Sequence, residues 1–473
     1  MSRHPSVVAV DVGTSAVRAA LVVGEHGTLR STRVDRRSDA GGRVFDAEEL
    51  WADVCRALRD LESDDAAPAA LAFSAHIGAV AIDRDLRAVG SAGGWADARG
   101  VDRLLTLPAS LLADLLTTAG RPVAAGGGLA YALELAASAS AHDVSAIVSP
   151  KDFLIARLCG AIVTDTIDAA YTGASDVRGR RWQDVALESA GVPSRWFPAQ
   201  VDPSEIVGEV DAVLAAELRL PPRLPVIAGG PDGSVGAGIL LGPRTDAIAD
   251  IGGTTDVVVR RVADARRPPP SAVVNPALDG REWTIGGPTG ATGGAVAWWR
   301  ERVGPVAESE WSSLGAGGAG IRLFPSMSGE RFPRWRPLAR GAAIGWGPEH
   351  EPAHLVRAAL EGAAFTVREA LDTLDPERLL PVLFAGGSAR SAEVARLRAA
   401  IFGREVHVAA DPDATLLGAA GLAFLGAGVA SDLEHAQELL RVRFSRHRPD
   451  EATAARYDEI FVEWAAMRDQ IAS

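Results

Sequence analysis

The chain of 473 residues has very little lysine. Its 48 basic residues include a single lysine, Lys151, and the others are arginines. Lys151 does not follow the glycine-rich run GxxxxGK[ST] of a P-loop, so that class of nucleotide-binding protein is excluded. A protein kinase needs a lysine on a strand, and the sequence excludes that class as well.

Cysteine and long apolar runs are also scarce. Cys55 and Cys159 are the only cysteines, which excludes a disulfide framework or a cysteine zinc site and is typical of a reducing compartment. No uncharged apolar run reaches the roughly 18 residues that span a membrane. The N-terminus lacks the apolar core of a signal peptide. We therefore expect a cytoplasmic protein with no membrane partner.

Positive charge is the minority sign. The 48 basic and 61 acidic residues give a net charge of −13, which argues against nucleic acid as a partner. Apolar residues make up 47% of the chain and charged residues 23%, as in soluble globular proteins. The length has room for roughly two to four domains.

A motif that occurs twice divides the chain into halves. Residues 7–23 and 246–261 both run from an apolar strand through Asp, a hydrophobe, Gly and two hydroxyl residues into a second apolar strand. This pattern predicts a β-hairpin with its polar residues at the bend. Because each copy begins one half of the sequence, we expect two related halves divided near residue 243.

Strands and helices alternate throughout, which predicts an α/β fold. Apolar runs bounded by turn residues predict buried strands, and apolar residues at helical spacing predict helices. The expected strands are 70–74, 79–83, 225–230 and 380–385; the expected helices are one capped by Asp46, most of 101–160 with a break at 126–128, and one from about 353 to 374.

The first bend has the composition of a phosphate-binding site. Thr14 and Ser15 offer hydroxyls beside successive backbone N–H groups, and such concave donor clusters bind phosphate oxygens. Arg18 lies just beyond the bend and can neutralise phosphate charge. Asp11 can hold Mg²⁺ through water, since Mg²⁺ usually keeps several waters. The alternative is a plain hairpin with a polar turn.

Asp232 follows the apolar strand expected at 225–230 and precedes a run of small residues, which permits close approach of a ligand. Its carboxylate is a candidate general base that removes the proton from an attacking hydroxyl. The alternative is a helix N-cap, a position that aspartate favours. The two roles are compatible.

Five further positions carry weaker signals. Gly387 follows a buried strand, and Ser391 lies one helical turn on, where a flat ring can rest against the backbone. His76 stands at a strand bend, a place where a histidine is more often structural than catalytic. Trp95 can form an apolar wall of a pocket. Lys151 starts a helix, either as a solvated cap or as a ligand.

The order of these motifs resembles the FGGY carbohydrate kinases of the actin/hexokinase/Hsp70-like superfamily, from Val7 to about Trp464. The first bend and Gly253-Thr254-Thr255 resemble the two phosphate motifs of the family. Gly229-Gly230-Pro231-Asp232 resembles the strand end that carries its catalytic aspartate. Further matching segments are Trp95-Ala96-Asp97-Ala98-Arg99, Lys151-Asp152-Phe153-Leu154, Thr164-Asp165 with Asp168-Ala169, Gly293 with Trp298, Gly329-Glu330-Arg331, Glu361-Gly362 and Gly386-Gly387-Ser388.

The resemblance implies two ribonuclease H-like (actin-like ATPase) domains with a central cleft. Residues 1–243 would bind the sugar and supply the catalytic aspartate, and residues 244–473 would bind ATP with Mg²⁺. The expected site residues are Thr14, Ser15, Arg18, Gly253, Thr254, Gly293, Gly387 and Ser391 for the nucleotide, His76, Trp95 and Asp232 for the sugar, Asp11 and Asp232 for the metal, and Asp232 for catalysis.

Two departures from the family pattern fall in the sugar pocket. Gly233 stands where many members have Gln or Asn, and residues 74–78 form a segment about one residue shorter than the common form. We expect transfer of the γ-phosphate of ATP to a hydroxyl of a small ketose or polyol, with a pentulose such as xylulose as first choice. Gluconate, erythritol or another polyol or sugar acid are alternatives, as is a non-catalytic nucleotide-binding regulatory or assembly protein. A homodimer is left open.

Overall fold

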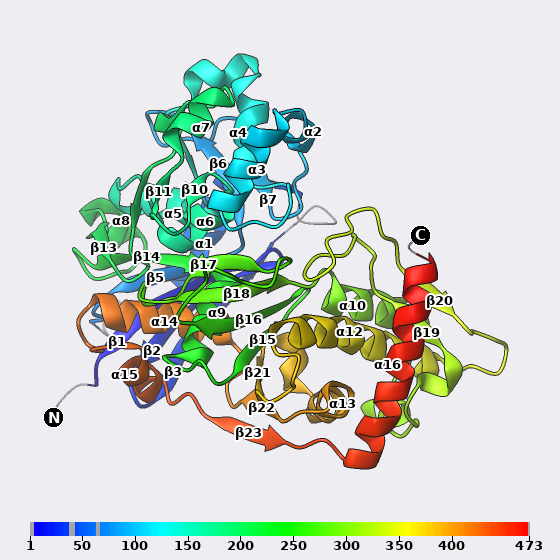
Figure 1. Cartoon of the computed structure of the whole chain (residues 1–473). Coiled ribbons are helices and arrows are strands. Elements are labelled where there is room, and N and C mark those ends of the chain that lie inside the picture. Colours follow the sequence, from blue (N-terminus) through cyan, green and yellow to red (C-terminus); the bar gives the residue numbers. More distant parts are fainter. Residues whose placement is uncertain (1–3, 37–42, 63–66, 472–473) are drawn as a thin grey trace. The chain divides into compact units, whose positions relative to one another are not determined.

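The computed structural model describes residues 4–36, 43–62 and 67–471 (Figure 1). The chain forms two compact units, each built from more than one stretch of sequence. Unit 1 consists of Met1–Pro243, Val274–Trp283 and Thr415–Arg441, and unit 2 of Arg244–Val273, Thr284–Ala414 and Val442–Ser473. Two segments from the second half of the sequence therefore belong to unit 1.

The central sheet of unit 1 is built around a hairpin. Its strands follow the order β13 (Ile206–Glu209), β14 (Pro225–Pro231), β5 (Leu71–Ala75), β1 (Ser6–Val12), β2 (Ala16–Val23) and β3 (Gly27–Asp35). β1 and β2 are antiparallel, with Asp11 opposite Arg18. β5 runs parallel to both β1 and β14, and β13 is antiparallel to β14. The carboxyl ends of β1, β5 and β14 consequently meet at one edge of the sheet.

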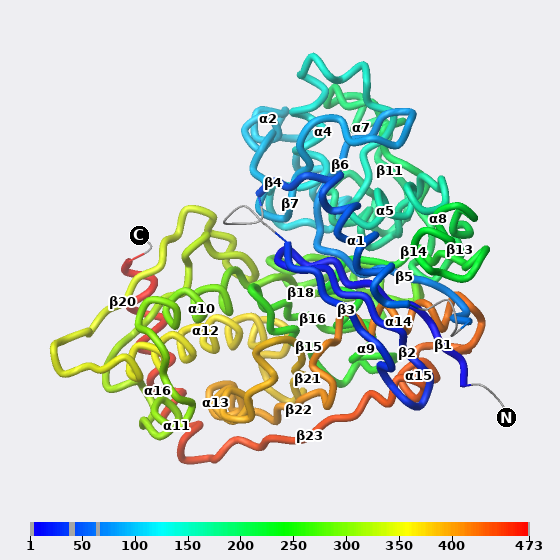
Figure 2. The backbone as a smooth tube through the Cα atoms, turned by 180° about the vertical axis from the view of Figure 1, so that it is seen from behind, coloured from blue at the N-terminus to red at the C-terminus, as the bar shows by residue number. Residues whose placement is uncertain are grey.

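Helices and a smaller sheet complete unit 1. α1 (Ala47–Leu61) packs against β2 and β3, which lie side by side in the view from behind (Figure 2). The smaller sheet has the order β4 (Val44–Phe45), β7 (Ala92–Gly94), β6 (Gly78–Ile82) and β8 (Ala146–Val148). The other elements are α2 (Val101–Leu105), α3 (Ala109–Thr118), α4 (Gly128–Ala136), α5 (Pro150–Cys159), β9 (Val163–Asp165), α6 (Thr166–Tyr171), β10 (Ser175–Asp176), β11 (Arg181–Trp182), α7 (Asp184–Ser189), β12 (Ala199–Val201), α8 (Ala212–Glu217), α9 (Asp232–Leu241), α14 (Ala414–Gly426) and α15 (Leu433–Leu439).

The central sheet of unit 2 repeats this arrangement. It contains, in order, β18 (Trp283–Pro288), β16 (Asp256–Val262), β15 (Ile248–Gly252), β21 (Val382–Ala385), β22 (Val406–Ala409) and β23 (Phe444–His447). β15 and β16 form the hairpin, β21 runs parallel to β15 and β22, and β23 is antiparallel to β22. The remaining elements of the second half are β17 (Val273–Pro276), α10 (Thr292–Val303), α11 (Glu308–Ser312), β19 (Arg322–Phe324), β20 (Ala342–Ile344), α12 (Pro352–Leu374), η4 (Gly387–Arg390), α13 (Ala392–Phe402) and α16 (Glu451–Ile471).

The two sheets share one spatial order and direction of strands, although the antiparallel edge strand precedes its neighbour along the chain in unit 1 and follows it in unit 2. The motif that occurs twice in the sequence therefore marks a duplicated structural unit. In each sheet a hairpin is followed by two strands parallel to its first strand and then by an antiparallel edge strand. A helix begins directly after the second parallel strand, α9 after β14 and α14 after β22. The predicted α/β fold is confirmed.

Burial explains why the hairpin strands are so apolar. Every residue of β1 is buried, which is expected for a strand covered on both faces of its sheet. A second apolar cluster lies beside the smaller sheet of unit 1 and includes Leu115, Leu187 and Trp196. Residues of β6 and β8 thus share one apolar cluster with residues of α3 and α7.

Most of the predicted elements are confirmed. Both hairpins form, and Asp46 caps α1 by accepting from the backbone N–H groups of Glu48 and Glu49 at 2.8 and 3.1 Å. The stretch 101–160 also contains β8, which the prediction of a mostly helical segment missed. Asp232 is the first residue of α9 and Pro231 is the N-cap, so the N-cap alternative was wrong by one position.

Within the ranges that the structure describes, no helix combines the length and the apolar character needed to cross a lipid bilayer.

Candidate active site

The hairpin of unit 1 places Asp11 and Arg18 opposite each other on neighbouring strands, where they form an ion pair. Arg18 donates to Asp11 Oδ2 from Nη2 at 2.6 Å and from Nε at 3.2 Å. Ser74, at the end of β5, donates its hydroxyl to Asp11 Oδ1 at 2.9 Å. Arg18 Nη2 also donates to Thr415 Oγ1 at 3.2 Å. Both oxygens of Asp11 therefore accept hydrogen bonds, which holds the carboxylate in one orientation.

Thr14 and Ser15 form the bend beyond this pair. The loop is closed by a hydrogen bond of 2.9 Å from the Gly13 N–H to the Ala16 carbonyl. Thr14 is half-buried and Ser15 is exposed. The bend thus carries two hydroxyl residues at least partly exposed to solvent, which suits a phosphate site.

Asp232 lies at the end of β14, and glycine makes that strand end possible. Gly229 has φ +72°, and a Cβ there would lie 2.1 Å from the Phe73 carbonyl oxygen on β5. Only glycine lets β14 turn this close to its neighbour. The chain then enters α9, where the Asp232 Oδ1 accepts from the Gly233 N–H at 2.6 Å.

The environment of Asp232 favours its protonated form more than water does. Burial, followed by the nearby charge of Asp11, raises the pKa of Asp232 to about 6. The hydrogen bond from Gly233 and the charge of Arg18 act in the opposite direction. A carboxyl group that titrates near neutral pH can both accept and release a proton, as general base catalysis demands.

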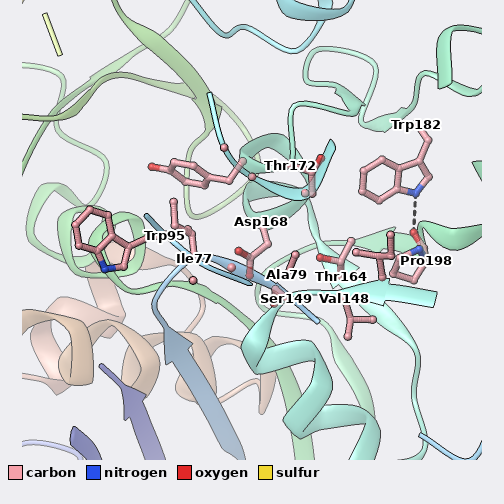
Figure 3. Close-up of a pocket in the computed structure, with 17 residues that line it drawn as sticks. Ile77, Ala79, Trp95, Val148, Ser149, Thr164, Asp168, Thr172, Trp182 and Pro198 are labelled. Carbon is pink, nitrogen blue, oxygen red and sulfur yellow. Dashed lines mark hydrogen bonds between the residues drawn. The ribbon is translucent and has the colours of Figure 1, made fainter. Parts of the chain in front are cut away.

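A cavity of about 550 Å³, counted to its open mouth, lies in unit 1 beside the smaller sheet. Its walls come from β6, β7, β8 and α6 and from the loops around them, and Figure 3 shows Asp168 between Trp95 and Trp182. The lining residues are Ile77, Gly78, Ala79, Gly94, Trp95, Gly126, Gly127, Gly128, Ile147, Val148, Ser149, Thr164, Asp168, Tyr171, Thr172, Trp182 and Pro198. Apolar and aromatic walls with a few polar groups are typical of small-molecule sites.

One wall of this cavity is joined to the helix turn that carries Asp232. Tyr171, the last residue of α6, lines the cavity, and its hydroxyl shares a hydrogen bond of 3.3 Å with Ser234 Oγ. Ser234 lies two residues after Asp232 in the first turn of α9. The candidate base and the cavity therefore belong to one continuous region of unit 1.

Lys151 lies beneath the cavity and is neither a solvated cap nor exposed. Its side chain is fully buried, and Nζ forms ion pairs with Asp165 at 2.8 Å, with Asp168 at 3.3 Å and with Asp152. Burial lowers the pKa of Lys151, but the three carboxylates outweigh it and raise the pKa above its usual value. Of the two alternatives for Lys151, the solvated cap was wrong, because the three acids stabilise its charge inside the unit.

In the same cluster, the negative charge of Asp168 is poorly compensated by positive charge. Burial, together with Asp165 and Asp152, raises the pKa of Asp168 well above its usual range, although Lys151 opposes the shift. Three carboxylates share one ammonium group, and their oxygens lie within 4.8 Å of one another. The ammonium group of Lys151 thus lies where a metal ion would otherwise bind among these three carboxylates.

Of the three residues expected at the sugar, Trp95 lines the cavity, whereas His76 and Asp232 do not. His76 is buried, with Nδ1 at 3.1 Å from the Ile77 carbonyl and Nε2 at 3.4 Å from Arg36 Nη1. Burial lowers the pKa of His76 to about 4, with Arg36 acting in the same direction. Arg36 also donates to the Gly13 carbonyl at 2.9 Å. A neutral His76 therefore supports the bend of the hairpin indirectly, through Arg36.

In unit 2, the bend at Gly253 and Thr254 is packed against the start of α10. The Gly253 N–H donates to the Thr255 carbonyl at 3.3 Å, and the Gly294 N–H donates to the Thr254 carbonyl at 2.9 Å. A Cβ on Gly293 would lie 2.0 Å from the Gly253 carbonyl oxygen. The structure thus brings together three of the expected nucleotide residues, with the N–H groups of a helix start beside them.

The acids of the second hairpin are buried rather than open. Arg398 from α13 pairs with Asp250 and, at 2.7 Å, with Asp256, which in turn accepts from the hydroxyl of Thr292. Burial, followed by the nearby Asp256, raises the pKa of Asp250 to about 8 against the effect of Arg398. The network ties β15, β16, α10 and α13 together.

Gly387 and Ser391 lie at the end of β21. Gly386, which precedes Gly387, has φ +93°, and a Cβ there would lie 2.5 Å from the Gly252 carbonyl oxygen. Ser391 caps α13 by accepting from the Val394 N–H at 3.1 Å, and it donates to Glu308 at 2.6 Å. The hydroxyl of Ser391 therefore already has two protein partners.

The donor set beside the first bend suits a hard cation. Asp11 and Asp232 are carboxylates close enough for the charge of Asp11 to raise the pKa of Asp232. Mg²⁺ binds through one or two carboxylates and retains water ligands. Since both Asp11 oxygens already accept hydrogen bonds, Asp11 fits a water-mediated contact.

Sequence reasoning missed Asp168 and Tyr171 as cavity residues. They stand three residues apart on α6, so they share one face of the helix. Charged residues within the otherwise apolar segments that carry Lys151 and Asp165 were the available signal, because buried charges occur in pairs or clusters.

Comparison with known proteins agrees with this architecture. The chain matches the N-terminal domain of the FGGY family of carbohydrate kinases over residues 6–238 and the C-terminal domain over residues 249–427. Xylulose kinase from Klebsiella pneumoniae is 26% identical over 474 residues, which cover 95% of this chain and 96% of that protein. Erythritol kinase from Brucella abortus (strain 2308) is 26% identical over 502 residues, which cover 98% and 95%.

A solved structure shares the fold. The crystal structure of gluconate kinase from Lactobacillus acidophilus superposes with a TM-score of 0.88 at 22% sequence identity, covering 99% of both chains. The duplicated α/β unit and the matched domains define an ATP-dependent phosphotransferase that acts on carbohydrates. The chain belongs to the FGGY family of carbohydrate kinases. This confirms the family, fold class and enzyme class predicted from the sequence.

Proposed function

We propose that the protein transfers the γ-phosphate of ATP, with Mg²⁺ as the metal, to a hydroxyl of a small ketose or polyol, and that a pentulose such as xylulose is its first candidate acceptor. The family supplies ATP as donor and a small sugar or polyol as acceptor. The observation that carries the proposal is Asp232, whose carboxyl pKa of about 6 suits a general base, in the helix turn joined to the cavity.

Asp232 would orient the acceptor hydroxyl and remove its proton as the oxygen attacks the γ-phosphorus. A positioned base of this kind contributes roughly 10²–10⁴-fold to the rate. The Tyr171–Ser234 hydrogen bond holds the cavity wall against the first turn of α9. An acceptor held in the cavity would thus be oriented by the same elements that position the base.

The two bends would bind phosphate oxygens through their backbone N–H and hydroxyl groups. Thr14 and Ser15 supply these donors in unit 1, and Gly253 and Thr254 supply them in unit 2. Arg18 would counter the phosphate charge. Donors fixed before the reaction stabilise charge on the transferred group without reorganisation.

Asp11 and Asp232 would hold Mg²⁺, Asp11 through water. The metal supplies neutralisation of phosphate charge when bound. Ser74 and Arg18 fix the Asp11 carboxylate by hydrogen bonds. Asp11 would therefore hold the metal in a constant position relative to the acceptor hydroxyl.

Substrate candidates come from the relatives. The names of the Klebsiella and Brucella relatives point to a pentulose and to a four-carbon polyol. We also propose a cytoplasmic site of action, which the low cysteine content supports.

The test is ADP release from protein, Mg·ATP and a panel of ketoses, polyols and sugar acids. We expect at least one small sugar or polyol to stimulate release, with xylulose tried first. A panel that stimulates nothing, although ATP binds, would reject the proposal.

The role of Asp232 is tested by Asp232→Asn. We expect turnover to fall by roughly 10²–10⁴-fold while the dissociation constant for ATP changes less than about twofold. Asp211→Asn is the matched control, since Asp211 also stands at a helix start of unit 1, where it caps α8. Turnover of the Asp232 variant close to that of the control would refute the assigned role.

A further inference from the structure

The lining of the cavity in unit 1 bears on which acceptors the cavity can bind. Among the described residues that line it, Asp168 is the only acidic side chain and none is basic. The remaining walls are aromatic or aliphatic side chains, hydroxyls and glycine backbone. An anionic ligand would find no counter-charge on the surface that it contacts.

Two cations beside this lining, Lys151 and Arg121, are already neutralised or turned away. Lys151 is buried and shared by Asp152, Asp165 and Asp168. Its side chain is fully buried and three carboxylates surround its ammonium group, so its charge is already balanced within the unit.

Arg121 is the second cation near the cavity. Its guanidinium stacks 4.9 Å from the centre of the Tyr171 ring. It donates to the Ala170 carbonyl at 3.0 Å, to the Val274 carbonyl at 3.3 Å and to Asn275 Oδ1 at 2.7 Å. Arg121 therefore supports α6 from outside the cavity and presents no charge to its interior.

The cavity is well equipped to bind an uncharged polyhydroxy compound. Trp95 and Trp182 stand on either side of Asp168 (Figure 3) and offer flat apolar faces for C–H groups. Glycines 126–128 line the cavity and pack closely on the rest of unit 1, since a Cβ on Gly126 would lie 1.9 Å from the Asp97 carbonyl oxygen. The carboxyl of Asp168 can hydrogen-bond a sugar hydroxyl in either protonation state.

We propose that this cavity selects an uncharged acceptor, a ketose or polyol, and that Asp168 is the residue that discriminates against sugar acids such as gluconate. The proposal rests on the proposed kinase function and narrows its acceptor. The carboxylate of Asp168 repels an anionic group, and the lining supplies no positive charge to compensate it. A carboxylate that leaves water without a counter-charge binds weakly.

The first test is equilibrium binding by calorimetry, in the absence of ATP, of matched pairs: xylulose against xylonate, and sorbitol against gluconate. We expect the uncharged member of each pair to bind on the order of 10²-fold more tightly. Equal binding of the two members, or tighter binding of the acids, would overturn the proposal.

The second test changes the discriminating charge. Asp168→Asn should reduce the preference for xylulose over xylonate by at least about tenfold, because it removes the repulsive group. Asp152→Asn is the matched control: it takes a carboxylate from the same lysine, but Asp152 does not line the cavity. An unchanged preference in the folded Asp168 variant would overturn the proposal.

A third variant covers the case in which Asp168→Asn does not fold. Ile77 is half-buried and lines the cavity, so Ile77→Lys adds a cation to the wall and should shift the preference toward xylonate by at least about tenfold. An unshifted preference would count against the proposal.

ADP release with the same pairs separates the two proposals. Efficient phosphorylation of gluconate would leave the kinase function standing and refute charge selection. Binding of xylulose but not xylonate, with no phosphorylation of any acceptor, would refute the kinase function and support charge selection.

Discussion

The two hairpins have the same backbone and opposite electrostatic roles. Each joins its strands through a three-residue bend, 13–15 in unit 1 and 253–255 in unit 2. In unit 1 the residue opposite Asp11 is Arg18, whose side chain is 27% exposed. In unit 2 the residue opposite Asp250 is Val258, and the cation comes instead from Arg398, which is buried. Duplication thus preserved the bend and changed where its charge is balanced.

The difference between the hairpins shows which of the two aspartates is placed to interact with a ligand. Asp11 faces a partly exposed arginine at the edge where three strands end, so its charge influences Asp232. Asp250 is fully buried and ties β15 to α13 through Arg398. One hairpin acid is therefore placed to act on a ligand, and its counterpart to hold the sheet and helix together.

The helix starts after the second parallel strand differ in the same way. Asp232 begins α9 in the first copy, whereas Ala414 and Thr415 begin α14 in the second. Thr415 contributes only an acceptor for Arg18. In the second copy the residue directly before α14 is Asp413, whose carboxylate pairs with Arg390 at 2.7 Å. Both copies therefore place an aspartate at this point, and they differ in the partner of its charge.

The largest expected contrast is in stability. Arg398→Met should destabilise the protein by about 3–5 kcal/mol, because it leaves two buried carboxylates without their cation. Arg18→Met should cost only about 1 kcal/mol, since its pair is partly solvated, but should lower turnover. Urea denaturation compares the two variants. Equal losses of unfolding free energy would show that the two hairpins do not differ in this way.

The pH dependence should follow Asp232 and not Asp250. A general base acts only when deprotonated, so kcat/KM should fall about tenfold per pH unit below the Asp232 pKa of about 6 and level off above it. Asp250→Asn should leave this acidic limb in place. A limb that disappears in the Asp250 variant, or is absent from the unaltered protein, contradicts the assignment.

Glycine substitutions should affect the second bend more than the first. A Cβ on Gly293 meets the Gly253 carbonyl at 2.0 Å, whereas a Cβ on Gly13 meets nothing closer than the Ala16 carbonyl at 3.2 Å. Gly293→Ala should cost about 1–3 kcal/mol of stability through overpacking and weaken ATP binding. Gly13→Ala should change both much less. Thermal unfolding and ATP titration measure the pair, and a reversed order would refute the comparison.

Thr415→Val should have the smallest effect. It removes one acceptor of Arg18 and leaves the pair with Asp11 intact, so we expect a loss of about 0.5–1.5 kcal/mol and turnover within about threefold of the unaltered protein. Steady-state kinetics and denaturation test this. A loss of turnover as large as that of Asp232→Asn would contradict this prediction and would indicate that Thr415 on α14 takes part in catalysis.

Local signals in the sequence were enough to predict both hairpins, the buried strands and Asp232. Alternating or continuous apolar runs and glycine turns act over a few residues, so a single segment contains them. The position of Asp232 after a strand and before small residues is a signal of the same kind. These features could be read without knowing which strands are neighbours.

Long-range placement could not be predicted. The burial of Lys151 depends on Asp165 and Asp168, which reach it only because β9 and α6 fold back on α5. Nothing in the sequence near His76 shows that both of its ring nitrogens meet protein partners. The cavity likewise depends on segments from residue 77 to residue 198 that come together only in the folded unit.

The assignment of α14 to unit 1 has a consequence for how the chain matures on the ribosome. A Cβ on Gly418 of α14 would lie 2.5 Å from Val235 of α9, so the two helices touch backbone to side chain with no room to spare. Unit 1 lacks this partner until translation has passed residue 441. The helix that carries Asp232 therefore acquires this packing partner only after nearly the whole second half of the polypeptide has been made, and a nascent chain exposes apolar surface until such packing is complete.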